Sequence, residues 1–273
     1  MRVHDIIETK KRPIFLDVNL TNETKNPLLI FSHGFKGFKD WGPFNYVSDS
    51  FVKNGINFLK FNFSHNGTTA KKPFDIDDLE AFGQNNFSIE LNDLQTVIDW
   101  SVRKLKTKVD LNRIYLLGHS RGGGISIIKG SEDQRIKKIV SWASVSDFEK
   151  RLVNEKTDLW KKRGVAYVFN KRTNQQLPLY YQFYEDYQRN KERFSIPKAS
   201  KSLKTPFLIV HGKDDETVSF EEASQLNRFI PHSKLIAIKN CNHVFNTSHP
   251  FKVCNVSKEL KIAINESIIF LKQ

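Results

Sequence analysis

A serine between two glycines marks the stretch of this chain best suited to covalent chemistry. Residues 118–122 read G-H-S-R-G and follow an apolar run that ends at Leu117. A sharp turn from a strand into a helix exposes such a serine hydroxyl. Gly118 and Gly122 are needed because a Cβ at either place would meet a neighbouring strand or helix. The first N–H groups of the helix point beside the hydroxyl, where an oxyanion would form. We therefore expect Ser120 to be a nucleophile.

A serine hydroxyl is a weak nucleophile at neutral pH unless a base takes its proton and an acid orients that base. His243 follows the last expected strand, in the stretch N-C-N-H-V-F, and is the candidate base. Asp214 and Asp215 both follow the expected strand 205–210 and compete for the role of the acid. Loops that follow parallel strands meet at one edge of a sheet. The chain order serine, aspartate, histidine is the order expected for such a triad in this architecture. We favour Asp215, because its D-x-x-V spacing makes Val218 an apolar anchor before the next helix.

An oxyanion needs donors, and we expect two backbone N–H groups to supply them. One belongs to Phe35, in an H-G-F turn after the strand 27–32, and the other to Arg121, directly after the serine. The remaining candidate histidines are expected to be structural: His33, His65, His119 and His211. No cluster has the spacing of a metal site, so we expect neither a metal nor a cofactor. Cys241 is expected to be a small buried residue.

Composition restricts the class of protein. The chain has 273 residues with 39% hydrophobic content, enough for one large core, and it has no apolar run long enough to span a bilayer. Its beginning lacks the apolar centre of a secretory signal, and its two cysteines make no disulfide framework, so we expect a cytoplasmic protein. The net charge is +13, and residues 148–204 carry 14 Lys and Arg against 6 Asp and Glu. Without a nucleic-acid motif, this charge predicts a solvated face and no nucleic-acid partner.

Apolar runs alternate with helical spacing over most of the chain. We expect strands at 27–32, 56–63, 113–118, 136–143, 205–210 and 234–238, helices at 44–53, 87–106, 121–130, 220–229 and 255–271, an antiparallel edge pair at 2–8 and 12–20, and a polar loop at 68–86. We expect Ser88 or a nearby asparagine to cap the helix at 87–106. This alternation predicts an α/β sheet that is mostly parallel and covered on both faces.

Residues 144–202 break the alternation. They combine charged helical stretches with a cluster of aromatic side chains, and they are too long for an ordinary loop. We interpret them as an inserted cap subdomain, with residues 1–143 and 203–273 forming the core. Tyr180, Tyr181 and Tyr184 are its candidates for contact with a substrate, because aromatic rings offer apolar walls with polar tips.

The motifs H-G-F, G-H-S-R-G-G, H-G-x-D-D-x-x-V and N-H-x-F resemble those of α/β-hydrolases over nearly the whole chain. Within that superfamily the chain is similar to the bacterial carboxylesterase group that includes cinnamoyl (feruloyl) esterases. The resemblance implies a sheet of about eight strands and a cap inserted after the sixth. It also implies a triad of Ser120, Asp215 and His243, with Phe35 and Arg121 as oxyanion donors. Arg121 departs from the small or apolar neighbour usual after the serine, which points to a substrate carboxylate or a structural ion pair.

These observations predict a serine hydrolase that cleaves small carboxylic esters through an acyl-enzyme. An aminopeptidase-like or thioester hydrolase would use the same triad. A ligand-binding protein with an idle triad would share the fold, and a nucleic-acid partner attracted by the basic cap is the least favoured alternative. The natural substrate and the oligomeric state are not predicted.

Overall fold

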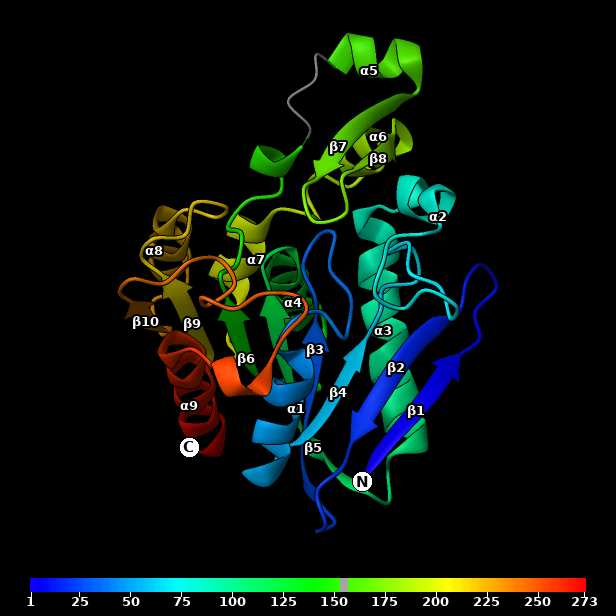
Figure 1. Ribbon diagram of the computed structural model, residues 1–273. Coiled ribbons are helices and arrows are strands. Elements are labelled where there is room, and N and C mark those ends of the chain that lie inside the picture. The colour runs from blue at the N-terminus through cyan, green and yellow to red at the C-terminus, as the bar shows by residue number, and fades with distance from the viewer. Residues whose placement is uncertain (153–156) are drawn as a thin grey trace.

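An eight-stranded sheet forms the centre of the computed structural model, which describes residues 1–152 and 157–273 (Figure 1). The strands lie in the order β1-β2-β4-β3-β5-β6-β9-β10. They are β1 (Arg2–Ile7), β2 (Ile14–Asn19), β3 (Asn26–Ser32), β4 (Asn57–Phe61), β5 (Val109–His119), β6 (Ile136–Trp142), β9 (Phe207–Gly212) and β10 (Lys234–Ile238). β2 pairs antiparallel with β1 and with β4, and the other neighbours are parallel. The predicted α/β sheet, with its antiparallel edge pair, is confirmed.

Helices cover both faces of the sheet, which explains why the central strands read as continuous apolar runs. The helices α1 (Phe44–Lys53) and α9 (Lys258–Lys272) pack on one face, where Phe31 of β3 lies 4.4 Å from Phe44 between ring centroids. The other face carries α3 (Phe87–Lys104), α4 (Arg121–Glu132), α7 (Ile196–Ser202) and α8 (Phe220–Phe229). Every residue of β9 is buried between these layers.

Side-chain caps set the start of several helices. Asn86 caps α3 by accepting a hydrogen bond from the backbone N–H of Ile89 at 2.9 Å, so the cap is a neighbour of Ser88. The expected loop 68–86 also contains a short helix, α2 (Leu79–Gln84), whose cap is Asp78. The loop prediction was therefore wrong at its end, because six residues are too few to show helical spacing. Among the described residues, no helix is both long and apolar enough to cross a membrane.

The segment after β6 differs from the predicted run of helices. It contains the 3₁₀ helix η1 (Glu149–Arg151), α5 (Thr157–Arg163), the antiparallel hairpin β7 (Val165–Asn170) and β8 (Gln175–Tyr180), and α6 (Gln182–Arg189); a further 3₁₀ turn, η2 (Val253–Asn255), precedes α9. Residues 153–156 of the expected cap lie outside the described residues. In Figure 1, α5, β7, β8 and α6 lie beyond the carboxyl ends of the parallel strands, beside α2. The hairpin was missed because each strand has only six residues and Pro178 within β8 argues against a strand.

Candidate active site

Ser120 lies at the turn between β5 and α4 in a backbone conformation that non-glycine residues rarely adopt. Its φ is +56° and its ψ is −120°. A residue held in such a region costs about 1–3 kcal/mol. The turn is possible because its flanking positions lack side chains. A Cβ on Gly118 would lie 2.2 Å from the carbonyl oxygen of Gly122, and a Cβ on Gly122 would lie 2.2 Å from that of Ser32. The predicted sharp turn between strand and helix is present.

Asp215 follows β9, His243 follows the edge strand β10, and the two side chains meet. The imidazole Nδ1 lies 2.8 Å from Oδ2 of Asp215. The other carboxylate oxygen accepts hydrogen bonds from the backbone N–H groups of Thr217 and Val218 at 2.9 and 2.8 Å. Burial alone would raise the pKa of Asp215, but hydrogen bonds from His211 and His243 bring it well below its usual range. An ionised Asp215 accepts a hydrogen bond from Nδ1–H of the imidazole, which leaves Nε2 free to act as the proton acceptor.

Asp214, the competing carboxylate, is exposed. Its backbone N–H donates to the carbonyl oxygen of Cys241 at 3.1 Å. Cys241 itself is buried, as expected from its size and polarity. Of the two aspartates, only Asp215 contacts the histidine.

The serine and the histidine border the same cleft. His119, which precedes the serine, contacts the carbonyl oxygen of His243 through Nε2 at 3.0 Å, and the two rings lie 4.9 Å apart between centroids. In the described structure Ser120 Oγ has no hydrogen bond to the imidazole. Such contacts are often loose before a substrate binds. The geometry brings Ser120, His243 and Asp215 to one edge of the sheet, as the sequence predicts, while their catalytic roles stay a prediction.

The turn that carries Phe35 approaches the serine closely. The N–H of Gly37 donates to the carbonyl oxygen of Gly34 at 3.0 Å, which closes a four-residue turn with Phe35 and Lys36 at its centre. A Cβ on Gly34 would lie 2.9 Å from the Cβ of Ser120, so only glycine allows this approach. The backbone of Phe35 therefore lies at the same cleft as the serine, where a backbone donor is expected.

Arg121 makes a buried ion pair inside the protein. Its guanidinium lies 3.3 Å from Oε1 of Glu90, with side-chain exposures of 8% and 3%. The guanidinium also lies 3.9 Å from the ring centroid of Phe35, and that ring packs on Phe82. Of the two explanations for this arginine, the structure gives the structural ion pair. Arg121 and Phe35, the two residues expected to donate to an oxyanion, are thereby packed against each other.

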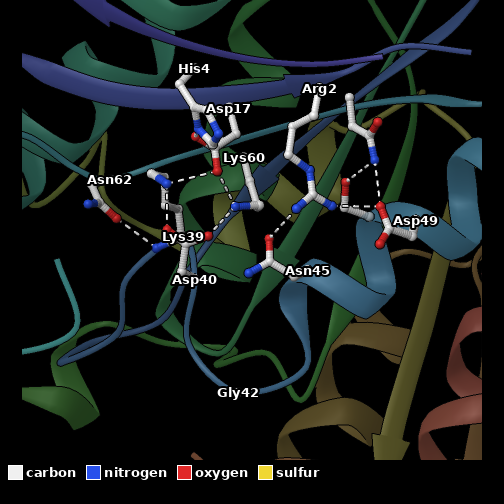
Figure 2. Close-up of polar contacts among 12 residues, drawn as sticks. Arg2, His4, Asp17, Lys39, Asp40, Gly42, Asn45, Asp49, Lys60 and Asn62 are labelled. Carbon is white, nitrogen blue, oxygen red and sulfur yellow. Dashed lines mark hydrogen bonds and ion pairs between the residues drawn. The ribbon is translucent and has the colours of Figure 1, made fainter. Parts of the chain in front are cut away.

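A second buried charge cluster supports the loop between β3 and α1. The Nζ of Lys60, on β4, contacts the carboxylates of Asp17 and Asp40 (Figure 2). Lys39 adds its own ammonium at 2.8 Å from Asp17, and its backbone N–H donates to the side chain of Asn62 at 2.6 Å. Burial opposes the charge on Asp17, but Lys60 and Lys39 lower its pKa to about 2. Sequence reasoning missed this cluster, although a lysine inside an apolar strand was a signal.

The cleft at Ser120 has a volume of about 390 Å³. It is lined by the loop after β3, by the serine turn, by the His243 loop and by the β7–β8 turn: Gly34, Phe35, Lys36, Gly37, Trp41, Phe44, His119, Ser120, Asn170, Arg172, His243, Val244, Thr247, Ser248 and His249. Its walls combine apolar rings with two cationic side chains. A cleft of this size fits a small-molecule substrate.

The tyrosines proposed for substrate contact do not line this cleft, and their contact with a substrate stays a prediction. The hydroxyl of Tyr180 donates to Glu80 at 2.5 Å, outside the cleft. Tyr181 and Tyr184 pack on Trp160 and on each other. Tyr181 and Tyr184 thus face α5. The end of the hairpin that borders the cleft is its β7–β8 turn, with Asn170 and Arg172.

The other histidines hold the backbone around the site. Burial lowers the pKa of His33 to about 4 and that of His119 to about 3, so both are neutral at physiological pH. His33 contacts the carbonyl oxygen of Gly34 through Nδ1 at 2.9 Å. Nε2 of His211 lies 2.8 Å from the carbonyl oxygen of Val218. These contacts agree with the expected structural roles.

Comparisons with known proteins match this fold. The BD-FAE family profile matches residues 78–230. The structure resembles the ferulic acid complex of Est1E from Butyrivibrio proteoclasticus, with a TM-score of 0.75, 19% identity, and coverage of 97% of this chain and 98% of the other. It also resembles a dienelactone hydrolase from Anabaena variabilis, with a TM-score of 0.66, 14% identity, and coverage of 100% and 97%.

A curated relative, the quorum-quenching protein AidA of Acinetobacter baumannii, is 25% identical over 127 residues. That alignment covers 46% of this chain and 38% of the relative. The chain thus matches about two fifths of the length of its curated relatives. The solved structures support the α/β-hydrolase fold over the whole chain.

Proposed function

The chain belongs to the BD-FAE family, and from this premise we propose that it is a serine hydrolase of small carboxylic esters. The observation that carries the proposal is that two groups border one cleft. They are Ser120, in a strained turn, and His243, which is hydrogen-bonded to the buried Asp215. The esterase neighbours with the same fold agree with it. Residues 144–202 act as the cap of this cleft, to which they contribute Asn170 and Arg172.

The proposed reaction has two halves. Ser120 Oγ attacks the ester carbonyl carbon while Nε2 of His243 takes the hydroxyl proton. The negative charge that forms on the carbonyl oxygen is stabilised by the backbone N–H groups of Phe35 and Arg121. The tetrahedral intermediate then expels the alcohol, which receives the proton from His243, and an acyl-enzyme remains.

A water molecule completes the cycle. Its proton passes to His243 as its oxygen attacks the acyl carbon, and the second tetrahedral intermediate releases the carboxylic acid as Ser120 recovers its proton. Asp215 remains ionised and stabilises the imidazolium in both halves. The same steps would cleave a thioester or an amide, so the triad leaves those two alternatives for the substrate panel to decide.

Turnover of a substrate panel tests the proposal. Purified protein is assayed with p-nitrophenyl esters of short and medium acyl chains, aminoacyl anilides and acyl-CoA thioesters. We expect ester turnover, and we expect Ser120→Ala to lower kcat by at least about 10³-fold. Ser131→Ala is the matched control and should keep wild-type turnover, because Ser131 is an exposed serine of α4 outside the cleft.

Equal turnover by wild type and Ser120→Ala would contradict the proposal. Turnover restricted to anilides or to thioesters would show that the substrate is an amide or a thioester. The proposed triad mechanism would then still hold. Absence of turnover across the panel, together with no reaction of Ser120 toward a fluorophosphonate, would favour a binding protein with an idle triad.

A further inference from the structure

The charged side chains that line the cleft at Ser120 share one sign. Among its described lining residues, Lys36 and Arg172 are cationic, and none is aspartate or glutamate. The two cations come from different parts of the chain, since Lys36 belongs to the loop after β3 and Arg172 to the β7–β8 turn. A concave site with charge of one sign attracts ligands of the opposite sign.

Lys36 occupies its turn at a conformational cost. Its φ is +60°, at the turn position where glycine or asparagine is favoured. Its ammonium donates to the carbonyl oxygen of Phe169 at 3.2 Å. That contact occupies one of three N–H donors, and no carboxylate is paired with Lys36 in the described structure.

The surroundings of Lys36 also disfavour a lone positive charge. The side chain is half-buried, and burial together with the nearby cations Arg121 and Lys171 lowers its pKa. A desolvated ammonium with donors to spare gains most when an anion arrives, because charge-assisted hydrogen bonds are about twice as strong as neutral ones.

Arg172, in the turn of the same hairpin that Lys36 contacts, has some of its donors already occupied. Its guanidinium lies 3.1 Å from Asp75, donates to the carbonyl oxygen of Phe74 at 2.9 Å and stacks over Phe38. Asp75 is 54% exposed, so solvent weakens this pair. Arg172 has five N–H donors in all, and those not used here remain for a ligand.

We propose that this cleft selects esters that carry a carboxylate, with Lys36 as the principal specificity-determining residue and Arg172 as the second. The inference rests on the proposed hydrolase function and names its substrate class: the anionic monoester of a dicarboxylic acid, or an ester of similar charge. The reacting carbonyl would lie at Ser120 while the distant carboxylate lies between the two cations.

A matched pair of esters tests the selectivity. Mono-p-nitrophenyl adipate carries a free carboxylate, and its methyl ester has the same chain without the charge. With spontaneous hydrolysis subtracted, we expect wild-type kcat/KM to be about 10- to 100-fold higher for the anionic ester, the gain typical of a charge-assisted hydrogen bond. We expect this ratio to fall with added salt.

Variants locate the selectivity. We expect Lys36→Met to lower the ratio by at least about tenfold, Lys36→Glu to invert it, and Arg172→Met to lower it by a smaller factor. Lys137→Met is the matched control, because Lys137 also donates to a backbone carbonyl but is exposed and lies outside the cleft. Its ratio should equal that of the wild type.

The outcomes separate this inference from the proposed function. Equal kcat/KM for the two esters in the wild type, or a ratio that Lys36→Met leaves unchanged, overturns the selectivity while hydrolysis itself stands. The latter result would mean that Lys36 only tethers the hairpin through Phe169. Turnover of neither ester, with no labelling of Ser120 by a fluorophosphonate, overturns the proposed function and the selectivity with it.

Discussion

Replacing Arg121 with methionine should destabilise the protein in a pH-dependent way. The ion pair with Glu90, at 3.3 Å, corresponds to about 5 kcal/mol at an effective dielectric of about 20. Without the arginine, a buried charged Glu90 would be unpaired. Uptake of a proton neutralises it and limits the loss of stability. For a glutamate carboxyl, whose ordinary pKa is 4.5, protonation costs about 3.4 kcal/mol at pH 7 and about 0.7 kcal/mol at pH 5.

The direction of this pH dependence follows from the pKa of Glu90, which burial raises and Arg121 partly lowers again. Removing the arginine raises that pKa further, so the folded variant keeps its proton to a higher pH than the folded wild type does. The loss of stability in Arg121→Met should therefore grow with pH, from about 1 kcal/mol at pH 5 to about 3 kcal/mol at pH 7. Urea unfolding at both pH values measures it.

The double variant Glu90→Gln/Arg121→Met is the control. It contains no buried charge at this place, so it should recover to within about 1–2 kcal/mol of the wild type and lose the pH dependence. In both the single and the double variant kcat should be about tenfold below that of the wild type, because Phe35 loses the guanidinium packed on its ring. A penalty equal at both pH values, or a double variant as unstable as the single one, would refute this account of the pair.

Three further predictions concern single residues. Asp215→Asn should lower kcat by about 10⁴-fold, since the histidine loses its orienting carboxylate, whereas Asp214→Asn should change it less than about threefold; similar losses in both would contradict the assignment of the acid. Burial raises the pKa of Asp93 from 3.8 to about 7, so its folded form holds a proton that the unfolded form releases. Stability should consequently decline between pH 4 and pH 7 by up to about 1.4 kcal/mol per unit, and urea titrations of Asp93→Asn that keep the same slope would argue against it. Gly122→Ala should abolish folding or cost several kcal/mol, because its Cβ would lie 2.2 Å from a backbone oxygen of β3; a wild-type melting temperature would exclude that clash.

Much of the fold was predictable because its elements are long and their apolar pattern is strong. The helices at 44–53 and 220–229 and the strand at 234–238 have the predicted bounds. Each of these helices buries one apolar face, and the strand is a short apolar run. Both patterns can be read from a single sequence. The expected number of strands in the sheet followed from the resemblance and not from the pattern.

The predictions were poorer where tertiary contacts decide the structure. The β7–β8 hairpin carries charged and polar residues, and its position depends on contacts such as that of Tyr180 with Gly83 of α2. Substrate contacts were assigned to tyrosines by composition alone, whereas Lys36 and Arg172 line the cleft. Which end of a hairpin faces the site is set by packing, and no local motif encodes it.

The candidate triad was predictable because each member follows a strand at the same edge of the sheet. Sequence order and turn chemistry singled out Ser120 and His243, and the apolar anchor Val218 favoured Asp215 over its neighbour. The partner of Arg121 was not predictable, because Glu90 lies 31 residues away on another helix. Only the packing of α3 against α4 brings that carboxylate to the guanidinium.

Mass-mapped labelling tests the central claim most directly. The wild type, Ser120→Ala and His243→Ala are treated with a fluorophosphonate, and each digest is searched for the phosphonylated peptide. We predict one adduct on Ser120 in the wild type, none in Ser120→Ala and a much slower reaction in His243→Ala. An adduct on another residue, or equal labelling of the wild type and His243→Ala, would contradict a serine activated by this histidine.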